Sequence, residues 1–195
     1  WKGADHRLPP SLKLQEIDTL IAELQKKKGL VPKRLAEERT RLDAAKARVT
    51  EEKEQLRKRE LEKRAAEKEA EEIGQTALRY QTQLNTAKTN DEYRALLAQI
   101  ERARGREGQS EDHVLAAMVE IEHLEETLRS SEAAEKVARD HHAERERELT
   151  ALAAKLEEGI QAKTAERTRV AASLDSPTLR RYERILAGKG GLAVA

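Results

Sequence analysis

The sequence predicts an all-α protein, a long kinked antiparallel coiled-coil helical hairpin with a short C-terminal helix. Charged residues make up 38% of its 195 residues, aromatic residues make up 2%, and Phe is absent. Such a composition is typical of long helices and coiled coils, whereas a globular core needs large apolar side chains. Two further observations predict the hairpin: apolar residues recur at heptad spacing, and a new helix starts near mid-chain. Two long helical arms joined by a tight turn bury their apolar seams by folding back on each other.

The mid-chain helix start is a capping box at Thr89-Asn90-Asp91-Glu92. The Thr89 hydroxyl is expected to accept a hydrogen bond from the N–H of Glu92, and the Glu92 carboxylate to accept one from the N–H of Thr89. This box separates a first arm, residues 11–88, from a second arm, residues 90–174. The hairpin of residues 11–175 therefore turns at residues 86–90.

The first arm follows an extended leader, residues 1–10, and is expected to begin with Ser11 as its N-cap. Two heptad columns can then be counted. One is Leu14, Ile21, Lys28, Leu35, Leu42, Val49, Leu56, Lys63, Ala70, Ala77 and Leu84; the other is Ile17, Leu24, Val31, Glu38, Ala45, Glu52, Arg59, Ala66, Ile73, Tyr80 and Ala87. Most positions are apolar, which indicates a coiled-coil arm. Lysines, a Gly and a Pro within 26–32 predict a kink near residues 29–32.

The second arm keeps a less apolar frame. Its predicted seam is Tyr93, Leu97, Ile100, Arg104, Glu107, Glu111, Val114, Met118, Ile121, Glu125, Leu128, Glu132, Glu135, Arg139, His142, Glu146, Leu149, Ala153, Leu156, Ile160, Lys163, Arg167, Val170 and Leu174. Because residues 132–146 are nearly all polar in this frame, we expect loose pairing there. The turn position predicts that Ile17 lies opposite Ile160, Ile21 opposite Leu156, Val49 opposite Leu128, Leu56 opposite Ile121 and Tyr80 opposite Leu97.

Charge supports the pairing of the two arms. Residues 11–88 carry 19 basic and 15 acidic side chains, whereas residues 89–175 carry 13 and 20. Each exposed pair stabilises a fold by only tenths of a kcal/mol, so this complementarity sets orientation more than stability.

A short basic helix is predicted at residues 176–188, with Asp175 or Ser176 as its cap and Pro177 in its first turn. Residues 189–195 are rich in Gly and are expected to link the hairpin to a further module beyond Ala195.

Several local motifs carry a family resemblance. They are Leu14-Gln15-Glu16-Ile17-Asp18, Val31-Pro32, Tyr80-Gln81-Thr82-Gln83-Leu84, Lys88-Thr89-Asn90-Asp91-Glu92-Tyr93-Arg94-Ala95-Leu96 and Tyr182-Glu183-Arg184-Ile185. With them the chain resembles the bacterial C4-type zinc-ribbon proteins that have an N-terminal helical-hairpin rod. The resemblance implies a kinked hairpin followed by a ribbon that holds one zinc ion through two Cys pairs. The chain has no Cys, so no cofactor is expected in these residues, and zinc is possible only if a Cys-bearing ribbon follows Ala195.

The resemblance also implies a function. Members of the family resemble non-enzymatic adaptors or chaperones of flagellar and type III secretion, which contact secretion components or an alternative sigma factor. Nucleic-acid binding is also suggested for the family. The chain is accordingly expected to bind protein partners, with RNA or DNA binding as the alternative and a structural spacer as a further one.

Candidate partner-binding residues lie at the two ends of the hairpin. Arg180, Arg181, Tyr182 and Arg184 place three cations and an aromatic ring on the short helix, a set that suits phosphate or an acidic partner. The competing interpretation is a helix packed on the hairpin base with solvated cations. At the turn, the capping interactions do not use Asn90, so its side chain is a candidate for partner binding. Tyr93 either packs on Leu84 or contacts a partner.

The residue pattern gives no indication of catalysis. The carboxylates are spread along solvated helix faces, and neither the adjacent His141 and His142 nor the widely spaced His113 and His123 have metal-ligand spacing. No apolar run approaches the roughly 20 residues that span a bilayer. We therefore expect a cytoplasmic protein that is not an enzyme and has no membrane partner.

Overall fold

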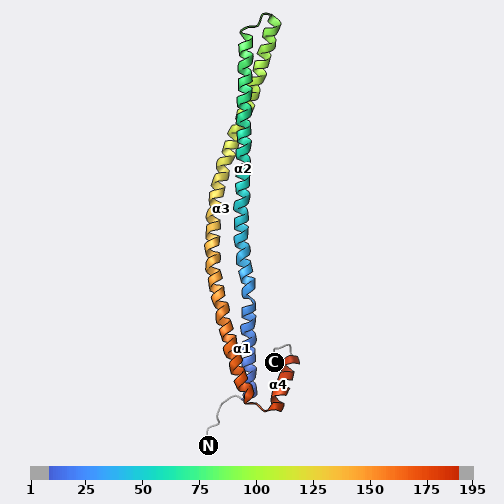
Figure 1. Cartoon of the computed structure of the whole chain (residues 1–195), viewed down its shortest axis with the longest axis vertical. Coiled ribbons are helices and arrows are strands. Elements are labelled where there is room, and N and C mark those ends of the chain that lie inside the picture. The colour runs from blue at the N-terminus through green and yellow to red at the C-terminus, as the bar shows by residue number, and fades with distance from the viewer. Residues whose placement is uncertain (1–8, 189–195) are drawn as a thin grey trace. The chain divides into compact units, whose positions relative to one another are not determined.

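The computed structural model describes residues 9–188, and this part of the chain consists of helices and turns without a strand (Figure 1). Its helices are α1 (Pro10–Gly29), α2 (Val31–Leu84), α3 (Asn90–Ala172) and α4 (Ser176–Gly188). The predicted all-α class is thus confirmed. Most of the predicted leader, residues 1–8, and the predicted link, residues 189–195, lie outside the described residues.

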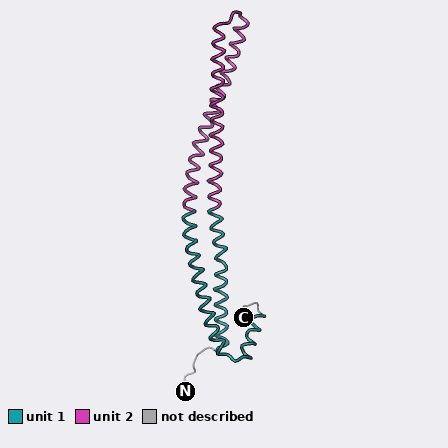
Figure 2. Tube along the Cα trace, viewed as in Figure 1, with its two compact units in different colours: residues 1–42, 139–195 teal, residues 43–138 magenta. Residues whose placement is uncertain are grey.

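The chain divides into two compact units (Figure 2). Unit 1 contains residues 1–42 and 139–195, and unit 2 contains residues 43–138. In unit 1, Asp18 pairs with Arg167 and Lys28 with Glu157. In unit 2, Lys53 pairs with Glu132 and Arg59 with Glu120. In each unit the partner number falls as the first number rises, so the paired segments are antiparallel.

The first helix begins one residue earlier than predicted. Its N-cap is Pro9, Pro10 occupies the first helical position, and the N–H of Lys13 donates to the Pro9 carbonyl over 3.0 Å. Pro suits this position because its fixed φ is already helical and its missing N–H would have no intrahelical acceptor. Ser11 therefore lies inside the helix, and its prediction as the N-cap was wrong.

The boundary between α1 and α2 is a single residue, Leu30, whose backbone stays in the right-handed helical region with φ −79° and ψ −18°. Its N–H donates to Lys27 and its carbonyl accepts from the N–H of Arg34. Pro32 has no N–H to donate to the preceding turn, so the helical ladder is interrupted here.

The turn between the arms spans Asn85 to Thr89, so the first arm ends four residues before the predicted residue 88. After the end of α2 the hydrogen bonds span three residues instead of four. The backbone N–H and the hydroxyl of Thr86 both donate to the Gln83 carbonyl. The N–H of Glu92 donates to the Thr89 hydroxyl over 3.2 Å, as predicted. The Glu92 carboxylate instead accepts from the N–H of Lys88 over 3.0 Å, one residue before the expected donor.

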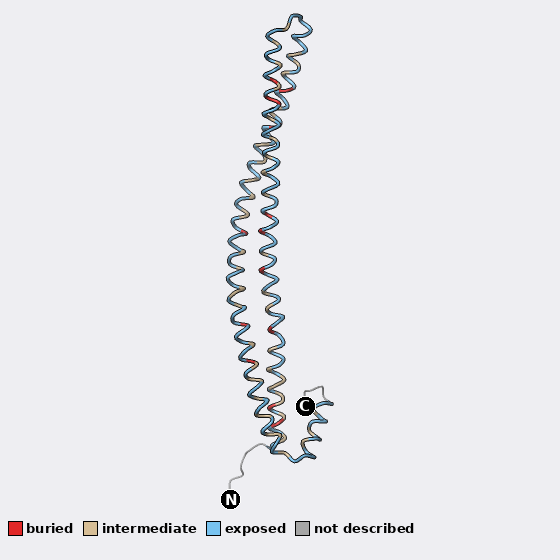
Figure 3. The backbone as a smooth tube through the Cα atoms, in the orientation of Figure 1, coloured by how far each residue is buried: buried red, intermediate tan, exposed pale blue. Residues whose placement is uncertain are grey.

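The seam predicted for the first arm is confirmed in the burial pattern (Figure 3). Every residue of its two heptad columns is buried or half-buried except Arg59. The most buried side chain is Leu14, with 0% of its surface exposed. A strict heptad of this length is the geometry of a left-handed coiled coil.

The seam predicted for the second arm was wrong in one column, between residues 97 and 146, and at Tyr93, which begins the other column and is exposed. The predicted members of that column, Leu97, Arg104, Glu111, Met118, Glu125, Glu132, Arg139 and Glu146, are exposed. The residue before each of them is buried or half-buried instead: Leu96, Ala103, Ser110, Ala117, Leu124, Ser131, Ala138 and Arg145. Small Ala and Ser side chains fill much of this seam, so counting large apolar residues selected the neighbouring column.

The two columns return to the predicted frame at Leu149. Arg145, Leu149 and Ala153 follow one another at intervals of four residues, whereas a heptad alternates intervals of three and four. Such an extra interval is a stutter, which locally unwinds the supercoil. It lies within unit 1.

The predicted register was also wrong in unit 1. It placed Ile21 opposite Leu156, but Lys28 reaches Glu157 over 2.5 Å, and a Cβ built on Gly159 would lie 3.4 Å from the Leu24 side chain. Between Asp18 and Lys28 the arms of unit 1 are therefore offset by about one heptad from the prediction, whereas Glu38 contacts His141, close to the predicted register. In unit 2 the register is close to the prediction near the turn, where Ile73, Ala77 and Ala103 form one buried cluster. Farther from the turn it is also wrong, because Lys53 pairs with Glu132, about one heptad beyond its predicted partner.

Candidate functional site

The short helix α4 is held in unit 1 by hydrogen bonds to one carboxylate. The Tyr182 hydroxyl donates to Oδ2 of Asp18 over 2.8 Å, and Nε of Arg167 donates to Oδ1 over 2.6 Å. These three residues, which we call the α4 clamp, connect α1, α3 and α4. Leu179 and Leu186 are half-buried on the same side of α4 as Tyr182. The inner face of α4 is thus occupied by contacts within the chain.

The electrostatics of the clamp keep each group in its bonding form. Hydrogen bonding to Asp18 raises the pKa of Arg167, so the guanidinium stays charged. Burial, with a further contribution from Asp18, raises the pKa of the Tyr182 hydroxyl, so this group remains a neutral donor. A carboxylate that accepts bonds from a cation and a hydroxyl makes a strong and directional connection.

The start of α4 is fixed by Asp175, one of the two predicted caps. The N–H of Thr178 donates to Oδ2 of Asp175 over 3.1 Å, and the N–H of Leu179 donates to its carbonyl over 3.0 Å. Hydrogen bonds from the Thr178 side chain and backbone lower the pKa of Asp175. The cap sets where α4 begins, and the clamp sets which face of it turns inward.

The predicted arginines occupy the opposite side of α4. Arg180, Arg181 and Arg184 are exposed, and helical spacing places them within about 100° of one another, away from Tyr182. None of the ion pairs found within residues 9–188 involves these three side chains, which we call the arginine face. The structure therefore places the four predicted residues on one helix but on two faces.

Sequence reasoning missed Asp18 and Arg167 as positioning residues. A signal was present, because Arg167 falls in a predicted seam column, where a cation needs a carboxylate partner. The i, i+3, i+7 spacing of Leu179, Tyr182 and Leu186 likewise marked the inner face of α4.

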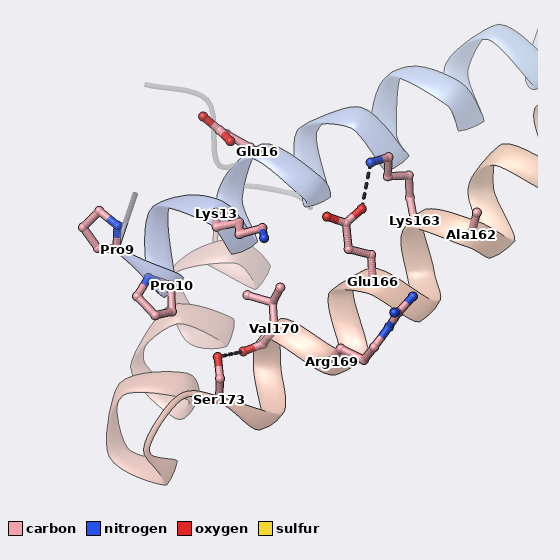
Figure 4. Close-up of a pocket in the computed structure, with 10 residues that line it drawn as sticks. All are labelled: Pro9, Pro10, Lys13, Glu16, Ala162, Lys163, Glu166, Arg169, Val170 and Ser173. Atoms are coloured by element: carbon pink, nitrogen blue, oxygen red, sulfur yellow. Dashed lines mark hydrogen bonds and ion pairs between the residues drawn. The ribbon is translucent and has the colours of Figure 1, made fainter. Parts of the chain in front are cut away.

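A groove of about 1030 Å³ lies elsewhere in unit 1, between the start of α1 and the end of α3 (Figure 4). Its lining includes Lys13, Lys163 and Arg169, together with Glu166, which accepts a hydrogen bond from Lys163 over 2.7 Å. That bond lowers the pKa of Glu166, with contributions from the charges of Lys13 and Arg169. The groove is thus mildly cationic.

The predicted turn residues belong to unit 2. Asn90 is exposed at the first position of α3, and 47% of Tyr93 is exposed. Tyr93 is accordingly not packed away, so both side chains are accessible to a partner.

The described residues contain no group of three or more His, Asp or Glu side chains that could hold a metal ion. His141 contacts the Glu38 carboxylate over 3.3 Å, and His142 lies 3.9 Å from that of Glu146. With no Cys in the sequence, these residues do not fit a zinc site. Among residues 9–188, no helix combines the length and the apolar character that crossing a membrane requires.

Comparisons with known proteins agree with this architecture. None of the curated proteins that were compared matches the chain. The crystal structure of CT398 from Chlamydia trachomatis superposes with a TM-score of 0.80 at 22% sequence identity, over 93% of this chain and 77% of that one. At this identity the likeness shows the fold alone. The family model of the CT398-like coiled coil hairpin domain matches residues 14–190. The chain therefore belongs to the CT398-like coiled coil hairpin family.

Proposed function

We propose that this protein is a non-enzymatic adaptor that binds an acidic segment of a protein partner on the arginine face of α4. The observation that carries the proposal is that the two faces of this helix differ: one is held by contacts within the chain, and the other exposes cations. Its inner face is fixed by the α4 clamp, while Arg180, Arg181 and Arg184 are exposed and have no ion-pair partner within residues 9–188.

A helix held in one orientation presents its cations without a further cost of ordering the backbone. Arginine suits the task because its planar guanidinium forms paired hydrogen bonds with carboxylates. Ile185 lies beside the arginines and is 50% exposed, so it offers an apolar contact next to the charges. A partner segment with two or three carboxylates around an aliphatic side chain would match this surface.

The family resemblance supports particular partners for this role, namely a flagellar or type III secretion component or an alternative sigma factor. Asn90 and Tyr93 at the turn of unit 2 provide a second accessible contact. The zinc ribbon stays a prediction, and the proposed adaptor function does not depend on it.

Nucleic acid is the competing ligand, and one contact disfavours it. Recognition of single strands relies on aromatic rings that stack on bases. Tyr182 is the aromatic residue of α4, but its hydroxyl is bound to Asp18 and its ring is half-buried. The arginines therefore lack an aromatic neighbour on their own face, which favours an acidic protein over RNA or DNA.

The test is a quantitative capture experiment with Arg180→Ala, Arg181→Ala and Arg184→Ala combined. The matched control combines Arg64→Ala, Arg79→Ala and Lys136→Ala, which are exposed cations on α2 and α3. We expect the α4 variant to lose capture of a specific protein that the control retains, with unchanged helicity. An acidic peptide from that protein should compete with it.

Equal capture by both variants would contradict the proposal. The proposal would also be contradicted if nuclease treatment of the unmodified protein abolished capture as the α4 variant does. The arginine face would then bind nucleic acid, and its affinity should fall as the salt concentration rises.

A further inference from the structure

A second surface, in unit 2, has the opposite charge and exposes large apolar side chains. Leu115, Met118 and Val119 on α3 are 60%, 48% and 69% exposed. Their i, i+3, i+4 spacing places them on one helix face. Acidic residues extend the same face in both directions: Glu111, Asp112, Glu122, Glu125 and Glu126. We call these eight exposed residues the acidic-apolar face.

The hairpin itself does not use this face. The seam of α3 here consists of Val114, Ala117, Ile121 and Leu124, which are half-buried. By helical geometry the acidic-apolar face points about 130° away from that seam. Its three apolar side chains are therefore left to water, an arrangement that marks binding surfaces.

The carboxylates of the face are also unused. Ion pairs of the described residues engage the neighbouring Glu107 and Glu120, with Arg104 and Arg59 respectively, but none of the five acidic members of the face. The sequence has no Lys or Arg between Arg106 and Arg129. The face is thus uniformly negative around an apolar centre.

A groove in unit 2 borders the apolar centre. It has a volume of about 480 Å³, and Val119 and Leu124 line it together with Gln55, Lys58, His123 and the ion pair of Arg59 with Glu120. A side chain of a partner that covers Val119 can therefore enter a recess rather than rest on a flat helix.

We propose that the acidic-apolar face binds a basic amphipathic helix of a partner protein. The face runs over about 22 Å from residue 111 to residue 126, at 1.5 Å per residue. A partner helix with aliphatic side chains at i, i+3, i+4 spacing and Lys or Arg beside them complements both its centre and its ends. Burial of the aliphatic side chains supplies affinity, and the charges supply orientation and a faster encounter.

Helix α4 of a second copy of this chain is also basic, but it fits the acidic-apolar face less well. Leu179, Tyr182 and Leu186 of α4 are half-buried within unit 1, so Ile185 is its only exposed large apolar side chain, beside the small Pro177 and Ala187. The proposed partner helix must present several aliphatic residues together, which α4 does not. The inference is independent of the adaptor function proposed for the arginine face, because that surface selects the opposite charge.

The experiment uses the full chain and two fluorescent peptides of identical Leu, Lys and Arg composition. One peptide places Leu at i, i+3, i+4 spacing, and the other is scrambled. We expect the amphipathic peptide to bind at least about tenfold more tightly by fluorescence anisotropy. The combined substitution Leu115→Gln, Met118→Gln and Val119→Gln should remove that preference, and Glu122→Lys, Glu125→Lys and Glu126→Lys should weaken binding by a similar factor.

The matched control combines Leu61→Gln, Leu78→Gln and Val137→Gln, which are also exposed aliphatic residues of unit 2. The control and the triple Arg→Ala variant of α4 should bind the peptide as the unmodified chain does. Equal binding of both peptides, or equal losses in the face and control variants, would overturn the proposal. Sedimentation that shows a dimer dispersed by the Leu115, Met118 and Val119 substitutions would assign the face to a second copy instead.

Discussion

Units 1 and 2 differ in the size of the side chains that they bury most deeply and in how far they expose large apolar residues. In unit 1 these side chains lie between the arms: Leu14, Ile17, Val31, Leu42, Leu149 and Leu156 are all buried. The seam of unit 2 instead buries Ala77, Ala103, Ser110, Ser131 and Glu52 beside Val49 and Ile73. Unit 2 also exposes Leu61, Leu78, Leu115 and Val119 by 53% to 69%, whereas the exposed large apolar residues of unit 1, such as Leu20 and Leu152, reach at most 50%. The comparison indicates that unit 1 holds more of the fold's stability, while unit 2 leaves apolar surface available for binding.

The largest effect is expected from Leu14→Ala. Leu14 is fully buried, so its truncation removes transfer free energy and leaves a cavity, at a cost of about 3 kcal/mol in the free energy of unfolding. Leu115→Ala, in the exposed face of unit 2, should cost less than about 0.5 kcal/mol. Urea denaturation of both variants checks the difference, and similar losses would erase the contrast between the units.

The α4 clamp provides the next largest effect. Asp18→Ala leaves Arg167 without its acceptor and frees the Tyr182 hydroxyl, at an expected cost of about 2 kcal/mol. Tyr182→Phe removes one neutral donor and should cost about 1 kcal/mol. A double-mutant cycle between Asp18 and Tyr182 measures their coupling. Additive losses would mean that α4 is not held through this carboxylate.

At the turn of unit 2, Thr89→Ala tests the cap of α3. The Thr89 hydroxyl accepts from the N–H of Glu92, and its loss should cost about 1 kcal/mol. Thr89→Ser keeps the acceptor oxygen and serves as the control. Thermal melts followed by circular dichroism compare the two, and an equal effect of both substitutions would exclude capping as the reason.

The smallest effect concerns Glu52, a buried carboxylate in the seam of unit 2. The Ser131 hydroxyl, followed by Arg48, lowers its pKa. A lowered pKa in the folded state stabilises the fold above the pKa of the unfolded state, and this stabilisation is lost as the pH falls. Glu52→Gln should therefore reduce the loss of stability between neutral and acidic pH. If the free energy of unfolding of Glu52→Gln depended on pH as that of the unmodified protein does, the Glu52 carboxylate would not contribute to acid sensitivity.

The sequence was most informative where large apolar residues keep a heptad, as they do along the first arm from Leu14 to Leu84. The capping interaction of Thr89 and the Asp175 cap were also predictable, because each depends on neighbouring residues. The α3 column failed because Ala103, Ser110 and Ser131 occupy the seam, and small side chains give a weak apolar signal. The register failed because it was counted from the turn alone, whereas the changed column of α3 and the stutter after Arg145 alter which residues of the two arms lie opposite each other.

The candidate site, like the fold, was predictable only where the signal is local in the sequence. The composition of α4 identified the arginines, and their exposure follows from helical spacing. Asp18 and Arg167 were not predicted as positioning residues, because they lie 149 residues apart in the sequence and meet only through the pairing of α1 with α3.

Hydrogen exchange measured by mass spectrometry tests the difference between the units most directly. Amides of residues 149–167 in unit 1 should exchange more slowly than those of residues 103–131 in unit 2, because opening the first set exposes more large apolar surface. Asp18→Ala should accelerate exchange in α4 and leave residues 103–131 unchanged. Faster exchange in residues 149–167 than in residues 103–131 would contradict the assignment of stability to unit 1.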